Sequence, residues 1–194
     1  MKARLQHRYS LDVVDKQELR EQIRAGGPVA EGESRQVVEG LFVWMSRRLP
    51  GTVSAFLAMS GEVDVSPLFT RLPGWRWVLP RVEPDKNLTF RDRAVPRERH
   101  RFGMDQPVAM GPVIAINQID VLVTPGLAFD MTGGRLGNGG GFYDRILSAK
   151  RSDAVAVAAT VKRRVVELVP MQDHDQRVDW IATEEGVIRC SSNS

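Results

Sequence analysis

The chain has 194 residues, of which 42% are hydrophobic and 26% charged, which is close to the average for a folded domain and excludes a mainly disordered chain or a membrane-spanning bundle. The net charge is only +3 and does not by itself point to nucleic acid. The single cysteine, Cys190, cannot form an internal disulfide, so we expect a reduced, cytoplasmic protein without a membrane partner.

The first elements in chain order are helices. We expect residues 1–15 to be a leader and residues 16–189 to form a single domain. The helix-forming stretch KQELREQIRA predicts a helix over residues 16–25, which a Gly-Gly-Pro sequence ends. Apolar residues then recur at helical spacing from about Ser34, which predicts a second helix that ends before Pro50.

Short apolar runs and further helices follow. Strands are predicted at residues 52–58, 76–82, 87–91, 119–125, 154–160 and 178–184. Short helices are predicted at 66–72, 141–150 and 165–170. The alternation of strands and helices indicates an α/β fold, in which one open, mostly parallel sheet is flanked by helices in a Rossmann-like three-layer arrangement.

The segment 121–147, VLVTPGLAFDMTGGRLGNGGGFYDRIL, carries the strongest chemical signal. Its glycines let backbone N–H groups approach a phosphate, and the start of the following helix favours an anion. Arg135 and Arg145 bracket the loop and offer charge-assisted hydrogen bonds to phosphate. No Lys follows Gly139, and Phe142 occupies the third glycine position, so neither a Walker loop nor a Rossmann fingerprint fits. Spacing alone predicts a phosphate-binding loop, with a mobile surface loop as the alternative.

This segment resembles the signature of the 5-formyltetrahydrofolate cyclo-ligase family, approximately P-G-x-A-F-D-x-x-G-x-R-L-G-x-G-x-G-[FY]-Y-D-R. The resemblance extends over about residues 16–188. Weaker similarities follow the family's order at Lys16-x-x-Leu19-Arg20, AFLAMSGEVDVSPL (55–68), VLPRV (78–82), RFGMDQP (101–107) and VPMQDHDQRVDWIATEEGVI (169–188).

The resemblance implies an ATP-dependent ligase. Members of the family convert 5-formyltetrahydrofolate to 5,10-methenyltetrahydrofolate and release ADP and phosphate, with Mg²⁺ as cofactor. The formyl oxygen is expected to attack the γ-phosphate, after which N10 adds to the activated carbon and phosphate leaves. The expected partners are ATP and 5-formyltetrahydrofolate, with no nucleic acid, and the expected state is a monomer or weak dimer.

The resemblance also implies roles for individual residues. Catalytic roles are expected for Arg135, Tyr143 and Arg145. ATP contacts are expected for Lys16, Arg20, Arg135, Leu136, Gly137, Asn138, Gly139, Gly140, Gly141, Phe142, Tyr143 and Asp144. The folate is expected to contact Leu57, Glu62 and Tyr143. The metal is expected at Asp144 and Asp175, whose oxygen ligands suit Mg²⁺.

Several alternatives stay open at this point. By spacing alone, Lys16 and Arg20 would form a solvated helix face. Gln106 stands where the family typically has Glu, and Arg164 where many members have Gln. A diverged paralogue that uses ATP on another small substrate, or a non-catalytic folate- or nucleotide-binding module, are the competing functions. The arginine-rich stretch 91–101 is predicted to be a solvated loop, with steering of anionic substrates as a second possibility.

Overall fold

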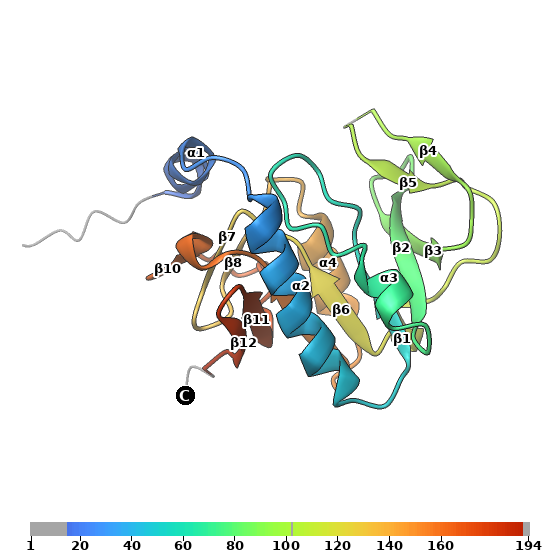
Figure 1. The fold of residues 1–194 in the computed structure, drawn as a ribbon. Coiled ribbons are helices and arrows are strands. Elements are labelled where there is room, and N and C mark those ends of the chain that lie inside the picture. The colour runs from blue at the N-terminus through green and yellow to red at the C-terminus, as the bar shows by residue number, and fades with distance from the viewer. Residues whose placement is uncertain (1–14, 102, 192–194) are drawn as a thin grey trace, which may run out of the picture.

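The computed structural model describes residues 15–101 and 103–191, which pack around a central seven-stranded sheet (Figure 1). Its strands are β1 (Thr52–Ser54), β2 (Arg76–Val82), β3 (Leu88–Asp92), β6 (Val121–Thr124), β9 (Val155–Ala159), β11 (Trp180–Thr183) and β12 (Gly186–Arg189). The strand order is β12-β11-β9-β6-β1-β2-β3. The inner strands run parallel, while β12 and β3 pair antiparallel at the two edges, which confirms the predicted mostly parallel sheet.

Helices cover both faces of this sheet. The helical elements are α1 (Lys16–Ala25), α2 (Glu31–Ser46), α3 (Leu68–Arg71), α4 (Phe142–Ala149) and the short 3₁₀ turns η1 (Ile116–Gln118) and η2 (Lys162–Arg164). Side chains of β6 alternate between the faces, as expected for a strand. Val121 and Val123 pack in the core formed with α2 and α3, whereas Leu122 packs in the core formed with α4. The fold therefore has the predicted three layers.

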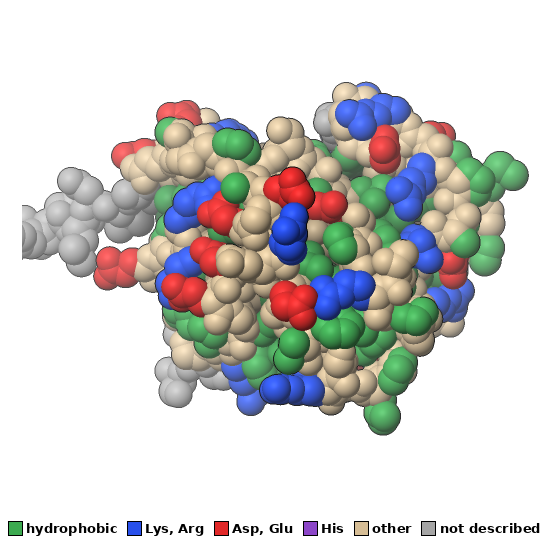
Figure 2. Space-filling model, viewed as in Figure 1, with side chains coloured by type: hydrophobic (Ala, Val, Ile, Leu, Met, Phe, Trp, Pro, Cys, Tyr) green, Lys and Arg blue, Asp and Glu red, His purple; other side chains and the backbone are tan. Residues whose placement is uncertain are grey.

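The outer face of α2 is polar, and acidic and basic side chains lie next to one another on it (Figure 2). Arg35 pairs with Glu31 one turn away at 2.9 Å, and Arg71 of α3 pairs with Glu39 at 2.8 Å. Exposed pairs of this kind contribute little to stability. Among the described residues, no helix combines the length and apolar character needed to cross a membrane.

Local capping explains where the first two helices begin. The side chain of Asp15 accepts hydrogen bonds from the N–H groups of Gln17 and Glu18, so α1 covers the predicted range. The second helix begins earlier than predicted, because the carboxylate of Glu33 accepts the Ala30 N–H at 2.8 Å and closes a polar first turn. Residues 1–14 of the predicted leader lie outside the described residues.

Two smaller sheets were absent from the predicted elements. One contains β7 (Ala128–Asp130), β8 (Arg135–Leu136) and β10 (Val165–Val166), and the other is the hairpin of β4 (Arg97–Arg99) and β5 (Asp105–Pro107). The prediction of a solvated loop over 91–101 is therefore wrong in two places. Arg91 belongs to β3 and is 6% exposed, and residues 97–99 form β4, although the side chains of β4 are exposed. The backbone of β4 pairs with β5, a strand that no local sequence pattern predicts.

The predicted helix at residues 165–170 is also wrong. Val165 and Val166 pair in parallel with Phe129 and Asp130 of β7. The N–H of Val169 donates to the buried carboxylate of Asp130 at 2.8 Å. These backbone groups are satisfied by distant parts of the chain, which removes the hydrogen bonds that a helix would need.

Candidate active site

A cavity of about 590 Å³ opens at the carboxyl ends of the parallel strands, between α1 and the β4–β5 hairpin. This edge of an open α/β sheet is where ligands commonly bind, and the volume is in the range of small-molecule sites. Every site residue expected from the sequence lines the cavity except Arg145: Lys16, Arg20, Leu57, Glu62, Arg135, Leu136, Gly137, Asn138, Gly139, Gly140, Gly141, Phe142, Tyr143, Asp144 and Asp175.

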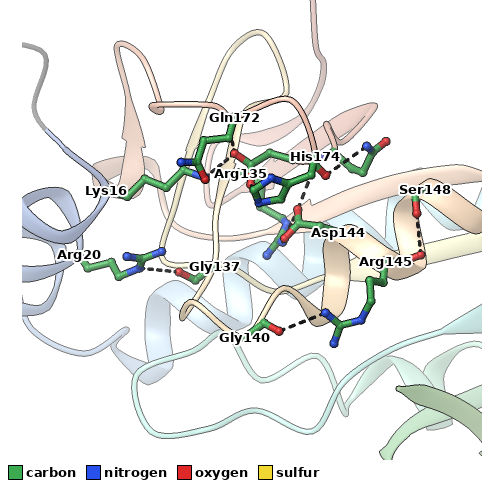
Figure 3. Close-up of polar contacts among 12 residues, drawn as sticks. Lys16, Arg20, Arg135, Gly137, Gly140, Asp144, Arg145, Ser148, Gln172 and His174 are labelled. Carbon is green, nitrogen blue, oxygen red and sulfur yellow. Dashed lines mark hydrogen bonds and ion pairs between the residues drawn. The ribbon is translucent and has the colours of Figure 1, made fainter. Parts of the chain in front are cut away.

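The glycine-rich loop, residues 137–141, connects β8 to the N-terminus of α4. Gly141 is the N-cap of α4 and has φ of +64°, a left-handed conformation that glycine adopts without strain. Arg20 Nε donates to the carbonyl oxygen of Gly137 at 3.0 Å (Figure 3), and Arg24 Nη2 donates to Asn138 Oδ1 at 3.3 Å. The arginines of α1 therefore hold the glycine-rich loop, which argues against a merely solvated helix face.

A buried ion pair lies beside this loop. Arg135 Nη2 donates to both carboxylate oxygens of Asp144 at 2.9 Å, and the two side chains are only 4% and 14% exposed. Asp144 also accepts the backbone N–H of Gln176 at 3.3 Å. Within the described part of the chain, Arg135 Nε has no hydrogen-bond partner. The guanidinium thus brings a fixed positive charge to the cavity wall and keeps one donor that these residues do not use.

A second ion pair joins α1 to the segment after β10. Lys16 Nζ donates to Asp175, whose carboxylate also accepts the N–H of Gln172 (Figure 3). Burial works against ionisation of Asp175, but the hydrogen bonds from Lys16 and Gln172 outweigh it and lower the pKa of this carboxyl. His174 Nε2 lies 3.7 Å from Asp175 Oδ1. Asp175 is therefore an ionised group at the cavity wall.

The two carboxylates expected to hold a metal are thus each paired with a cation. Asp144 is bound by Arg135 and Asp175 by Lys16. The described residues contain no group of three or more His, Cys, Asp or Glu side chains arranged to hold a metal ion. Protein atoms alone do not build a complete cation site here, so a metal at this place would need oxygen atoms from a ligand.

On the other side of the cavity, the chain leaves the sheet after Ser54, earlier than the predicted strand 52–58, and carries Leu57 and Glu62 to the cavity wall. Glu62 Oε2 accepts the N–H of Met59 at 2.9 Å. Burial raises the pKa of Glu62, while the hydrogen bond from Met59 and the charge of Arg164 lower it. The site therefore holds a largely buried carboxyl that can accept further hydrogen bonds.

Tyr143 lies on the first turn of α4, near Glu62 and Arg135. Burial raises the pKa of its hydroxyl, the negative charge of Glu62 adds to this effect, and the positive charge of Arg135 opposes it. The phenol therefore stays protonated at neutral pH and can donate a hydrogen bond. Tyr143 also packs against the core on the α4 side of the sheet.

Arg145 lies on the outside of the glycine-rich loop. Its Nη2 donates to the carbonyl oxygen of Lys86 at 2.8 Å and its Nη1 to that of Gly140 at 3.4 Å. The guanidinium also lies 5.2 Å from the centre of the Phe142 ring. These contacts hold the glycine-rich loop through a residue that does not line the cavity. The catalytic role expected for Arg145 remains a prediction.

Sequence reasoning missed the wall that the β4–β5 hairpin and β2 provide. Met104, Asp105 and Gln106 line the cavity there. Gln106 is 3% exposed, and its side chain accepts the N–H of Val82 at 3.1 Å and donates to Glu98 at 3.2 Å. The sequence offered two signals there, the similarity of RFGMDQP (101–107) to the family and the departure of Gln106 from its pattern, and neither predicts a hairpin across the sheet edge.

Comparisons with known proteins point to one family. The model of the 5-formyltetrahydrofolate cyclo-ligase family matches residues 12–184. The 5-formyltetrahydrofolate cyclo-ligase of Escherichia coli K12 is 31% identical over 178 residues, which cover 87% of this chain and 98% of that protein. The enzyme of Mus musculus is 26% identical over 149 residues, which cover 69% of this chain and 73% of the mouse protein.

Solved structures show the same fold. The 5,10-methenyltetrahydrofolate synthetase of Aquifex aeolicus superposes with a TM-score of 0.77 at 29% identity, covering 92% of this chain and 94% of that one. The corresponding protein of Mycoplasma pneumoniae gives a TM-score of 0.73 at 22% identity, covering 88% and 99%. At this lower identity the second match supports the fold alone.

Proposed function

Because this chain belongs to the 5-formyltetrahydrofolate cyclo-ligase family, we propose that its cavity is the active site in which ATP drives cyclisation of 5-formyltetrahydrofolate to 5,10-methenyltetrahydrofolate. The chain is a ligase of folate one-carbon metabolism. The observation that carries the assignment is the meeting of α1, residues 57–62, the glycine-rich loop and residues 172–175 around one cavity. The diverged paralogue and the binding module are not favoured by these matches.

The triphosphate of ATP is assigned to the half of the cavity next to α1 and the glycine-rich loop. Lys16, Arg20 and Arg135 all line this half and carry positive charge. The N-terminus of α4 adds backbone N–H groups and the positive end of the helix dipole. Preorganised donors of this kind stabilise the charge of a phosphoryl group during transfer without needing a protein nucleophile.

The folate is assigned to the half formed by Leu57, Glu62 and Tyr143. An ionised Glu62 would accept hydrogen bonds from the N–H groups of the pterin, and Leu57 would contact its apolar surface. The protonated hydroxyl of Tyr143, which also lines the cavity, would donate to an oxygen of the substrate. The formyl group of the folate and the γ-phosphate of ATP would then meet beside Arg135.

The reaction in this cavity proceeds in two steps. The formyl oxygen attacks the γ-phosphorus, an O–P bond forms, and the bond to the β-phosphate oxygen breaks to release ADP. The formyl carbon then carries the phosphate group through the formyl oxygen, as an N5-iminium phosphate. N10 attacks this carbon and loses its proton, the C–O bond to phosphate breaks, and the five-membered methenyl ring closes. Arg135 would offset the charge that accumulates on the transferred phosphoryl group.

We assign Mg²⁺ as the cofactor, which Asp144 or Asp175 would hold together with oxygen atoms of the nucleotide. Mg²⁺ prefers oxygen donors and commonly takes only one or two protein carboxylates beside substrate phosphates. Both carboxylates line the cavity, so the residues present fit an ion that is completed by the nucleotide. When bound, the ion supplies positive charge against the triphosphate. A cytoplasmic location and a monomeric or weakly dimeric state remain predictions.

The test is a coupled assay with purified protein, 5-formyltetrahydrofolate and Mg-ATP. The methenyl product absorbs light, so its formation and the release of ADP are followed in the same reaction and are expected in equal amounts. Omission of either substrate should abolish both. ADP release without the methenyl product would favour the diverged paralogue, and binding of either ligand without turnover would favour the binding module.

A further inference from the structure

Arg164 is a buried arginine to which the proposed function gives no role of its own. It is the last residue of η2, just after β9, and it is 7% exposed. Its Nη1 donates to the carbonyl oxygen of Gly61 at 2.8 Å, and its Nη2 donates to that of Gly27 at 3.1 Å. One guanidinium therefore joins three segments that are far apart in the sequence: η2, the loop between α1 and α2, and the turn that precedes Glu62.

The turn at Gly61 is tight and directly determines where Glu62 lies. Gly61 has φ of +87°, which favours glycine. The Glu62 N–H donates to the Met59 carbonyl at 3.0 Å, and the Met59 N–H donates back to the Glu62 side chain at 2.9 Å. A Cβ built on Gly61 would lie 3.6 Å from Pro28 Cα, so the turn packs against the α1–α2 loop. A shift of the turn at Gly61 would move the Glu62 carboxylate.

We propose that Arg164 is a positioning residue for folate binding, which fixes the Glu62 turn against the α1–α2 loop and places a positive charge behind the Glu62 carboxylate. The planar guanidinium suits this task because two of its nitrogens reach two carbonyl oxygens at once. The inference rests on the proposed function, since it takes Glu62 as the residue that accepts hydrogen bonds from the pterin.

The charges around Glu62 support this role. Arg164 lowers the pKa of Glu62 against the effect of burial, and Tyr143 faces Glu62 from α4. Burial lowers the pKa of Arg164, the charge of Arg163 lowers it further, and the charge of Glu33 raises it. An ionised Glu62 offers both oxygens as acceptors, whereas protonation turns one of them into a donor, so the charge of Arg164 favours the form that suits the N–H groups of the pterin.

Arg163 provides a matched control on the same turn. It pairs with Glu33 and donates to the carbonyl oxygen of Pro28 at 2.8 Å, so it also fastens the α1–α2 loop, but it makes no hydrogen bond to Gly61. A purely structural contribution of η2 to the α1–α2 loop would be lost in variants of either arginine. An effect through Glu62 would be lost only in variants of Arg164.

The experiment compares Arg164→Gln, Arg164→Lys and Arg163→Gln with the wild type. Calorimetric titration with 5-formyltetrahydrofolate gives Kd without turnover, and the coupled assay gives KM for each substrate. Loss of a buried hydrogen bond from a charged group predicts that Arg164→Gln weakens folate binding about tenfold, while KM for ATP changes less than about twofold. Arg164→Lys keeps the charge and should recover part of the loss, and Arg163→Gln should bind folate as the wild type does.

Equal weakening by Arg164→Gln and Arg163→Gln, or a parallel rise of both KM values in Arg164→Gln, would overturn the inference. So would a folate Kd for Arg164→Gln that equals the wild-type value. If Arg164→Gln does not fold, Arg164→Lys decides the question by the ratio of its two KM values. These outcomes differ from failure of the proposed function, in which the wild type itself would form no methenyl product.

Discussion

Replacement of Asp144 by Asn tests the buried ion pair beside the glycine-rich loop. The carboxylate receives two hydrogen bonds of 2.9 Å from Arg135, and both side chains are almost fully buried. The amide of Asn has a similar shape but no charge, so Arg135 would keep its charge inside the protein without a counter-ion. Loss of one partner from a buried pair costs about 3 kcal/mol. With a urea m-value of about 2.5 kcal/mol/M, the unfolding midpoint should fall by about 1.2 M.

The control is Asp173→Asn, which removes a carboxylate from an exposed position nearby and should change the free energy of unfolding by less than about 0.5 kcal/mol. In the double variant Arg135→Met with Asp144→Asn, no uncompensated charge remains, so its loss of stability should be smaller than the sum of the two single losses. If Asp144→Asn unfolds at the same urea concentration as Asp173→Asn, the buried pair does not hold the loop as described.

The remaining predictions concern the two halves of the cavity and its hairpin wall. Arg20→Met, which loses the hydrogen bond to Gly137 and a charge at the cavity wall, should raise KM for ATP at least about fivefold in steady-state assays. Arg24→Met loses a longer, exposed hydrogen bond to Asn138, and Arg24 does not line the cavity, so this variant should raise KM for ATP less; equal effects would contradict the assignment. Glu62→Gln should raise KM for the folate more than KM for ATP. In the wild type the folate KM should rise as the pH falls through the raised pKa of Glu62, because the carboxylate becomes protonated; in Glu62→Gln, which has no titrating group there, it should not. Gln106→Glu would place a second carboxylate against Glu98 and should lower Tm in thermal unfolding; an unchanged or higher Tm would show that the two groups do not repel each other.

Local signals predicted the elements whose ends are set locally. Asp15 and the residues after it define α1, and the apolar run 76–82 coincides with β2. The short strands β7, β8 and β10 contain two or three residues each, and their pairing depends on contacts across the chain. For the same reason the stretch 165–170 was predicted as a helix, although its backbone hydrogen-bonds with β7 and Asp130.

The residues of the candidate site were predicted better than its walls. The long signature around the glycine-rich loop pointed to Arg135, Tyr143 and Asp144, and all three line the cavity because they are spaced along one segment; the roles expected for them remain predictions. The position of Arg145 outside the cavity could not be read from the sequence, since it depends on which face of α4 turns toward Lys86. The pairing of Arg164 with Gly61 likewise joins residues that only the folded chain brings together.

The central claim is that this cavity brings the formyl oxygen of the folate against the γ-phosphate of ATP. The most direct measurement uses 5-formyltetrahydrofolate labelled with ¹⁸O in the formyl group, followed by mass spectrometry of the phosphate released during one turnover. The proposed step transfers the formyl oxygen to phosphorus and then breaks its bond to carbon, so the released phosphate should carry the label. Unlabelled phosphate, with methenyl product formed at the normal rate, would contradict the account.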